Sequence, residues 1–254
     1  MTTQSPEFLE RSDGAKLAYN KVAGASPGIV FLHGLMSDRD GTKALALAEY
    51  CARAGRACIR FDMFGHGAST GRFEDGNISR WTDDAAAVID HLTEGPQILV
   101  GSSMGGWVMV RAALARPDNV AGLIGIAPGP DFTEDITWPG FSKAERETLE
   151  TKGIVNVQSD YDVRPYPISR QLIEDGRKNL VLRGPIPLSC PVRLIHGQKD
   201  TAVPWETSMR LAENISGDDV NVLLVKNGDH RLSEAADIER LCMVLDELIR
   251  RVQT

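Results

Sequence analysis

The chain has 254 residues, of which 42% are hydrophobic and 25% charged, as in an ordinary globular protein. A net charge of -7 argues against the basic face that nucleic-acid binding requires, so we expect no nucleic-acid partner. No apolar run approaches the roughly 20 residues that span a bilayer, so we expect no stable membrane insertion. The four cysteines show no metal-binding spacing and the first residues no targeting pattern, which predicts free thiols and a cytoplasmic location.

Apolar runs alternate with helical patterns along most of the chain. A β-hairpin is expected at residues 8–20, around the turn Ser12-Asp13-Gly14. Further strands are expected at residues 28–32, 57–62, 97–100, 120–127, 192–196 and 220–225. Helical patterns of 10 to 15 residues separate many of these strands, and a clean apolar stripe marks a last helix at 238–252. This alternation predicts an α/β protein with a mostly parallel, eight-stranded sheet flanked by helices.

The alternating pattern breaks between residues 128 and 188, where prolines cluster at both ends. Two short helices are expected there, one opened by the capping box Ser142–Glu145 and the other covering 169–175 and ending at Gly176. A segment this long inside a compact domain is usually functional. We therefore predict a core formed by residues 1–128 and 188–254, with residues 129–187 as a small helical lid.

The most informative motif is Gly101-Ser102-Ser103-Met104-Gly105, which follows one predicted strand and opens a helix. This strand–turn–helix context is that of a nucleophile elbow, with Ser103 at its strained apex. Gly101 and Gly105 lack the Cβ atoms that would collide where strand and helix approach each other. Ser102 is the alternative nucleophile, but its position in the motif points it away from the apex.

A serine nucleophile needs a base, and a histidine base needs a carboxylate to orient it. His230 follows the last strand at the carboxyl edge of the sheet, and Asp200 follows the strand at 192–196. Their order after Ser103 is that of α/β-hydrolases, so Ser103, Asp200 and His230 are the predicted triad. Asp131, which follows the strand before the lid, is the competitor for the acid, and Asp229 is less suited because it adjoins His230 in sequence.

The tetrahedral intermediate of such a reaction requires two hydrogen-bond donors. We assign them to the backbone N–H groups of Met104, at the start of a helix, and Leu35, in the loop after the strand at 28–32. Asp62 and His66 are expected to hold a glycine-rich loop together. No metal-ligand cluster or dinucleotide-binding fingerprint is present, so neither a metal nor a cofactor is expected.

These motifs, with His33-Gly34 and Asp62-x-x-Gly65-x-Gly67-x-Ser69, resemble the α/β-hydrolase superfamily. The stretches SPGIVFLHG, GTKALALAEYC, ACIRFD, GPQILVGSSMGGW and CPVRLIHGQKDTAVPWETSM are similar to a narrower family. That family comprises palmitoyl-protein thioesterases and mycophenolic acid acyl-glucuronide esterases, the α/β-hydrolase domain-containing protein 10 group. The resemblance covers most of the core but little of the lid. It implies an α/β-hydrolase fold, maps the family's triad onto Ser103, Asp200 and His230, and implies long-chain acyl thioesters or acyl glucuronides as substrates.

The sequence thus predicts a serine hydrolase that cleaves an ester or thioester of a small or acylated substrate through an acyl-enzyme. Its apolar acyl pocket is expected to include His33, Trp138, Phe141 and Tyr161. Two alternatives stay open. One is a carbon–carbon bond hydrolase or perhydrolase that uses the same triad, and the other is a ligand-binding homologue with low turnover. The oligomeric state is not predicted.

Overall fold

A computed structural model describes residues 5–159 and 162–253. Within these ranges, eight strands form one sheet in the order β1-β2-β4-β3-β5-β6-β9-β10. β2 pairs antiparallel with β1 and β4, and all other neighbours run parallel, which confirms the predicted sheet. The strands of this sheet are β1 (Glu7–Glu10), β2 (Lys16–Val22), β3 (Ala25–Leu32), β4 (Arg56–Phe61), β5 (Gln97–Ser102), β6 (Val120–Ile126), β9 (Val192–Gly197) and β10 (Val220–Val225).

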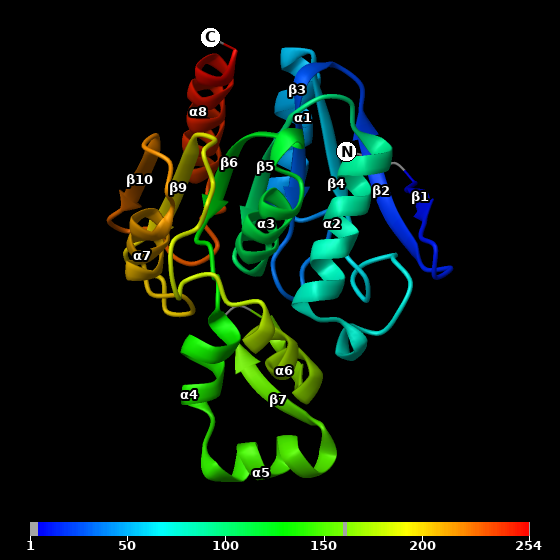
Figure 1. The fold of residues 1–254 in the computed structure, drawn as a ribbon, viewed down its shortest axis with the longest axis vertical. Helices are drawn as coiled ribbons and strands as arrows, with labels where there is room; N and C mark the ends of the chain where they lie inside the picture. The colour runs from blue at the N-terminus through cyan, green and yellow to red at the C-terminus, as the bar shows by residue number, and fades with distance from the viewer. Residues whose placement is uncertain (1–4, 160–161, 254) are drawn as a thin grey trace.

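Helices cover both faces of the sheet (Figure 1). Ile29 and Phe31 of β3 pack with α1 and α8, whereas Val30 and Leu32 pack into the cluster that contains α2, α3 and α7. Because successive side chains of β3 are buried on opposite faces, this strand reads as a continuous apolar run. The helices are α1 (Thr42–Ala54), α2 (Ile78–Leu92), α3 (Met104–Ala115), α7 (Glu206–Asn214) and α8 (Ala235–Val252), with short turns η1 (Phe73–Asp75) and η2 (Pro117–Asn119).

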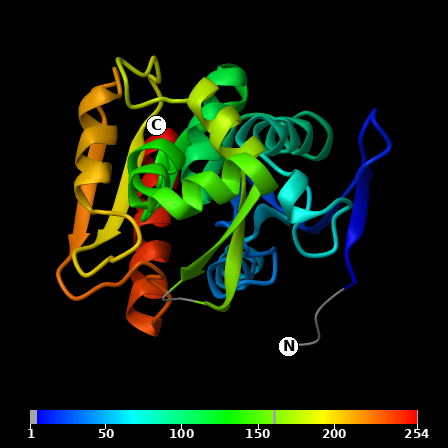
Figure 2. The ribbon, with the colours of Figure 1, turned by 90° about the horizontal axis from the view of Figure 1, so that it is seen from below.

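The chain between β6 and β9, residues 127–191, is called the insertion below. Figure 1 places it at one end of the sheet, and Figure 2 shows it lying across that end. It contains η3 (Thr133–Thr137), α4 (Trp138–Gly140), α5 (Lys143–Lys152), β7 (Ile154–Ser159), β8 (Asp162–Ser169) and α6 (Arg170–Lys178). β7 and β8 form a separate antiparallel hairpin. The two predicted helices and the capping box of Ser142 and Glu145 are present, but the segment also contains a hairpin that the predicted small helical lid did not include.

The second predicted helix of the insertion does not end at Gly176 but continues to Lys178. Gly176 lies inside this helix, at a point where its neighbours leave no room for a side chain. A Cβ atom there would lie 2.3 Å from Oγ1 of Thr133 and 3.3 Å from the Trp107 ring. The glycine therefore lets α6 approach both η3 and the helix that follows the elbow, which a sequence-based stop signal does not reveal.

Candidate active site

Ser103 lies between the last residue of β5 and the first residue of α3. Its backbone has φ 54° and ψ −120°, a conformation that residues other than glycine rarely adopt. A Cβ at Gly101 would lie 2.4 Å from the carbonyl oxygen of Gly105, and a Cβ at Gly105 would lie 2.2 Å from that of Leu32. Both glycines are required by this close approach. The predicted strained elbow is confirmed.

Two further side chains, from loops that follow β9 and β10, reach the elbow. His230 Nε2 lies 2.9 Å from Ser103 Oγ, and His230 Nδ1 lies 2.7 Å from Asp200 Oδ2. The structure therefore brings the three predicted triad residues into one hydrogen-bonded chain. In this arrangement Nδ1 carries the hydrogen donated to the carboxylate, which leaves Nε2 able to accept the hydroxyl proton of the serine.

Asp200 is held as a carboxylate by donors on both of its oxygens. Oδ1 accepts from the backbone N–H groups of Ala202 and Val203, each at 2.8 Å. Oδ2 accepts from His230 and also from His196, whose Nε2 lies 3.1 Å away. Burial alone would raise the pKa of Asp200, but the hydrogen bonds from His196 and His230 outweigh it and hold that pKa well below its usual range.

The competing carboxylates serve other purposes. Asp131 is fully buried and accepts from the backbone N–H groups of Val181 and Leu182 at 2.8 and 2.9 Å, so it joins the two ends of the insertion. Burial raises the pKa of Asp131. Asp229 accepts from the N–H of Leu232 at 3.0 Å and so closes the turn that carries His230.

The two predicted oxyanion donors are placed beside the serine. Met104 is the first residue of α3, where backbone N–H groups have no partner within the helix. A Cβ at Gly34 would lie 3.3 Å from the Cβ of Ser103, so the loop that carries Leu35 passes directly against the nucleophile. Leu35 and Met104 both line the cavity above Ser103. Their role as donors stays a prediction.

His33 does not line the cavity above Ser103, contrary to the sequence-based expectation that it would belong to a substrate pocket. Its ring is buried and lies outside the cavity lining. Nδ1 lies 2.8 Å from the carbonyl oxygen of Gly34, and Nε2 accepts from the backbone N–H of Met63 at 3.1 Å. Burial lowers the pKa of His33 to about 4, so the ring is neutral at pH 7 and ties the loop after β3 to the loop after β4.

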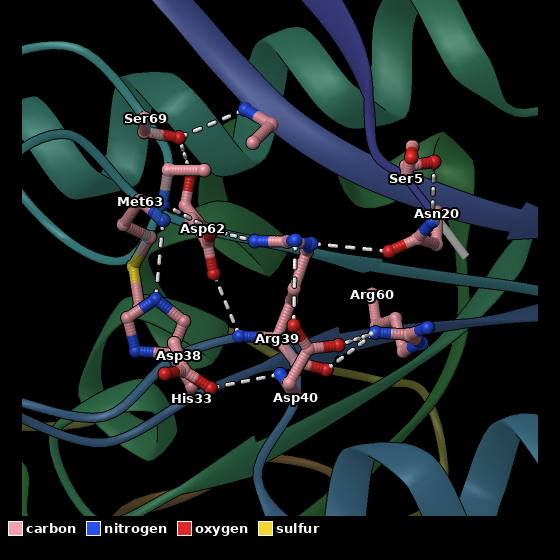
Figure 3. A network of polar contacts seen from close by, with 12 residues as sticks. Ser5, Asn20, His33, Asp38, Arg39, Asp40, Arg60, Asp62, Met63 and Ser69 are labelled. Carbon is pink, nitrogen blue, oxygen red and sulfur yellow. Dashed lines mark hydrogen bonds and ion pairs between the residues drawn. The ribbon is translucent and has the colours of Figure 1, made fainter. Parts of the chain in front are cut away.

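Asp62 extends this link between the two loops (Figure 3). Its carboxylate accepts from the backbone N–H of Arg39 at 2.7 Å and from that of Ala68 at 2.8 Å, and it pairs with the Arg39 guanidinium. Ser69 Oγ donates to the carbonyl oxygen of Asp62 at 2.6 Å. The predicted structural role of Asp62 is confirmed by these bonds.

A cavity of about 620 Å³ opens above Ser103, within the range of about 300–1,000 Å³ that ligand pockets occupy. Of the four predicted pocket residues, Phe141 lines it. Trp138 does not, because its ring lies against Phe141 and under the guanidinium groups of Arg146 and Arg177. Tyr161 lies outside the described residues.

The β7–β8 hairpin contributes a wall to this cavity that was not expected from the sequence. Val157, Tyr166 and Ile168 line it from the hairpin. Their signal in the sequence is the alternation of apolar residues in Ile154–Val157 and 166–168, a period of two that marks strands. The larger part of the lining surface is apolar, and three charged side chains, Lys43, Glu145 and Arg231, also line the cavity. The apolar residues of the lining are Phe31, Leu35, Met36, Ala44, Met104, Phe132, Ile136, Phe141, Val157, Tyr166, Ile168, Ala202 and Val203.

Over residues 5–159 and 162–253, no group of histidine, cysteine, aspartate and glutamate side chains is arranged to hold a metal ion. In the same part of the chain no helix has the length and apolar character needed to cross a membrane. The four cysteines are free, with Cys51 and Cys58 buried and Cys190 and Cys242 partly buried.

Comparison with known proteins agrees with this geometry. The family described as serine aminopeptidase, S33 matches residues 25–165. Human palmitoyl-protein thioesterase ABHD10, mitochondrial, is 45% identical over 253 residues, which cover 98% of this chain and 82% of the relative. The solved structure of α/β-hydrolase domain-containing protein 10 from mouse has a TM-score of 0.90 at 40% identity and covers 98% of this chain and 100% of the mouse chain. Est1E from Butyrivibrio proteoclasticus has a TM-score of 0.76 at 18% identity, covers 98% of this chain and 99% of its own, and shows the fold alone.

The fold and the match to residues 25–165 define a hydrolase of the α/β-hydrolase class. Within that class, the chain belongs to the ABHD10 family of serine hydrolases. The resemblance noted in the core sequence is thereby confirmed. It extends along nearly the whole chain, including the insertion, which the quoted stretches did not cover.

The expected cytoplasmic location was wrong. The relatives from human, orangutan and cattle, each 45% identical to the chain, are named as mitochondrial proteins and point to the mitochondrion instead. Free cysteines carry little information about the cellular location, because a thiol buried in an apolar core stays unpaired for reasons of packing alone.

Proposed function

We propose that this protein hydrolyses carboxylic esters or thioesters with Ser103 as nucleophile, His230 as general base and Asp200 as the acid that orients it. The observation that carries the proposal is the hydrogen-bonded chain from Ser103 Oγ through His230 to Asp200, at 2.9 and 2.7 Å, on the floor of an apolar cavity. A serine hydroxyl is a weak nucleophile unless a base takes its proton, and this chain supplies that base.

In the first step, Ser103 Oγ attacks the carbonyl carbon while its proton passes to His230 Nε2. The tetrahedral oxyanion then accepts hydrogen bonds from the N–H groups of Met104 and Leu35, and the dipole of α3 adds to its stabilisation. His230 returns the proton to the departing alkoxide or thiolate, which leaves Ser103 acylated. A water molecule, deprotonated by His230, releases the acid and regenerates the serine.

The acyl group is proposed to be a medium or long alkyl chain. The cavity walls are mostly apolar, and each buried CH₂ group contributes about 0.8 kcal/mol to binding. The relatives named palmitoyl-protein thioesterase support the same substrate class. The insertion, which supplies the outer wall of the cavity, is proposed to act as the lid that selects the acyl chain.

Labelling with a fluorophosphonate tests the nucleophile. Wild-type protein is expected to incorporate one probe per chain, and Ser103→Ala to incorporate none. Ser102→Ala is the matched control because it removes the neighbouring hydroxyl, and it is expected to label normally. Labelling of Ser103→Ala would overturn the assignment.

A substrate panel tests the reaction. We expect kcat/KM on p-nitrophenyl esters and acyl thioesters to rise with acyl length and to exceed by far any activity on diketones. Faster cleavage of a diketone would indicate a carbon–carbon bond hydrolase. Tight binding of a panel member without turnover would indicate a ligand-binding homologue.

A further inference from the structure

A second histidine, His196, contacts the proposed catalytic acid. It lies in β9, is fully buried and is not part of the cavity lining. Its Nε2 lies 3.1 Å from Asp200 Oδ2 and 3.0 Å from the carbonyl oxygen of Val203, and its Nδ1 lies 2.7 Å from Ser208 Oγ. Both ring nitrogens are therefore engaged in polar contacts.

The neighbours of the ring fix where its hydrogen resides. Nε2 faces two acceptors, the carboxylate of Asp200 and the carbonyl of Val203, so Nε2 must carry a hydrogen. In the neutral ring Nδ1 is then an acceptor, and Ser208 in α7 is the residue that donates to it. The Ser208 hydroxyl thus selects the tautomer of His196 that donates to Asp200.

This donation completes the coordination of the carboxylate. An ionised carboxylate offers about four acceptor positions. Two backbone N–H groups occupy Oδ1, while His230 and His196 share Oδ2. If residue 196 were apolar, Oδ2 would lose the hydrogen bond from His196, and the carboxylate would be held less firmly in the plane that His230 needs. The carboxylate of Asp200 would also stay buried with one hydrogen-bond partner fewer, which costs free energy.

We propose that His196 is a positioning residue for catalysis, which acts through Asp200 to hold the carboxylate in the orientation that His230 requires. The proton stays on His196 Nε2 throughout, and no bond to His196 forms or breaks. Ser208, His196, Asp200, His230 and Ser103 then form one continuous hydrogen-bonded series from α7 to the elbow. This inference rests on the proposed function.

Steady-state kinetics of His196→Leu and His196→Gln test the proposal. Leucine removes the donor, and kcat is expected to fall by about 10- to 100-fold, the range of a hydrogen bond to a charged group. KM is expected to change less than about twofold, because His196 does not line the cavity. Glutamine can present an N–H at a position close to that of Nε2 and is expected to restore kcat to within a few-fold of wild type. Each kcat is divided by the fraction of chains that a fluorophosphonate labels at completion, which corrects for misfolded protein.

A double-mutant cycle separates positioning from a general loss of stability. When Asp200→Asn already disrupts the carboxylate, adding His196→Leu is expected to reduce kcat by less than about threefold further. If His196→Leu multiplies the loss equally in both backgrounds, or raises KM instead of lowering kcat, His196 does not act through Asp200 and the proposal is overturned.

Ser208→Ala decides the question if His196→Leu does not fold. It removes only the hydroxyl that fixes the tautomer, and is expected to lower kcat several-fold in wild type but not in the Asp200→Asn background. Equal kcat with and without the Ser208 hydroxyl would overturn the proposal. Failure of the proposed function gives a different result, since wild-type protein would then show neither labelling at Ser103 nor turnover.

Discussion

The end of the sheet that carries Ser103 and the insertion that covers it are built in different ways. At the sheet end, short loops after parallel strands place each polar group against a fixed partner, as Asp200 shows with donors on both oxygens. The insertion has short helices and a two-stranded hairpin, and such a hairpin is marginally stable on its own. Polar contacts help attach it to the core. The residues proposed to carry out the chemistry therefore lie at the strand ends of the sheet, whereas the proposed selection of the acyl chain involves a segment that depends on tertiary packing.

The largest effect is expected at the sheet end, from Asp200→Asn. An amide in place of the carboxylate favours the wrong tautomer of the histidine, and the same change in a serine protease lowers kcat by about 10⁴. We expect a loss of that order here, measured on a short p-nitrophenyl ester. Asp229→Asn is the matched control, since Asp229 accepts from the N–H of Leu232 and an asparagine oxygen can do the same. Equal losses of kcat in the two variants would show that Asp200 is not the acid of the triad.

The buried ring of His33, in the loop after β3, is expected to make the stability of the protein sensitive to acid. Burial lowers the pKa of His33 to about 4, below the value of about 6.5 that an unfolded chain gives. Because the folded-state pKa is depressed, the neutral ring contributes stability above pH 6.5, and this contribution is lost as the pH falls toward 4. Between pH 7.5 and 5.0 we expect His33 to account for a loss of about 2 kcal/mol in the free energy of unfolding.

Urea unfolding at the two pH values measures this loss. His33→Gln is expected to be less stable than wild type at pH 7.5 but to lose about 2 kcal/mol less between the two values. His91→Gln, at an exposed position near the end of α2, is expected to show the wild-type loss. If His33→Gln keeps the full pH dependence, the acid sensitivity arises elsewhere.

The same contrast explains how much the sequence predicts. The five-residue motif at 101–105 is enough to predict that Ser103 occupies a strained turn, because this strain depends on neighbours in sequence, namely the glycines at 101 and 105. His33 and Trp138 were misplaced because cavity lining depends on which way a ring turns in the folded chain, and their partners Met63 and Arg177 are about 30 or more residues away in sequence. The β7–β8 hairpin was missed because its strands pair only with each other, outside the sheet whose alternation with helices the sequence predicts.

In the insertion, Phe141→Ala is expected to alter selectivity rather than chemistry. The Phe141 ring lines the cavity, so its removal takes apolar contact from long acyl chains and little from short ones. We expect the ratio of kcat/KM for a C16 thioester to that for a C4 thioester to fall about tenfold. Trp138→Leu is the control, because Trp138 does not line the cavity, and its effect on the ratio should be smaller. A uniform loss across chain lengths would place the acyl chain elsewhere.

The smallest effect is expected where α6 is tied to the core. The Asp175 carboxylate accepts from the backbone N–H of Ser79 at 2.8 Å and from its hydroxyl at 2.7 Å, at the start of α2. Asp175→Ala is expected to lower the free energy of unfolding by about 1.5 kcal/mol, the lower end of the range for a hydrogen bond to a charged group. Loosening this tie should also make the insertion more accessible to protease, while kcat on a C4 ester stays at the wild-type value.

Limited proteolysis with mass spectrometry locates the cuts. Glu174→Ala removes a neighbouring carboxylate whose contact with Arg170 is on the exposed side of α6, and it should leave the cutting pattern unchanged. Faster cutting confined to residues 127–191 in Asp175→Ala would show that the insertion opens independently of the sheet end. Cuts spread over the core, or a large fall in C4 turnover, would show instead that the two regions unfold together, because loss of one tie would then disturb the frame that holds Ser103.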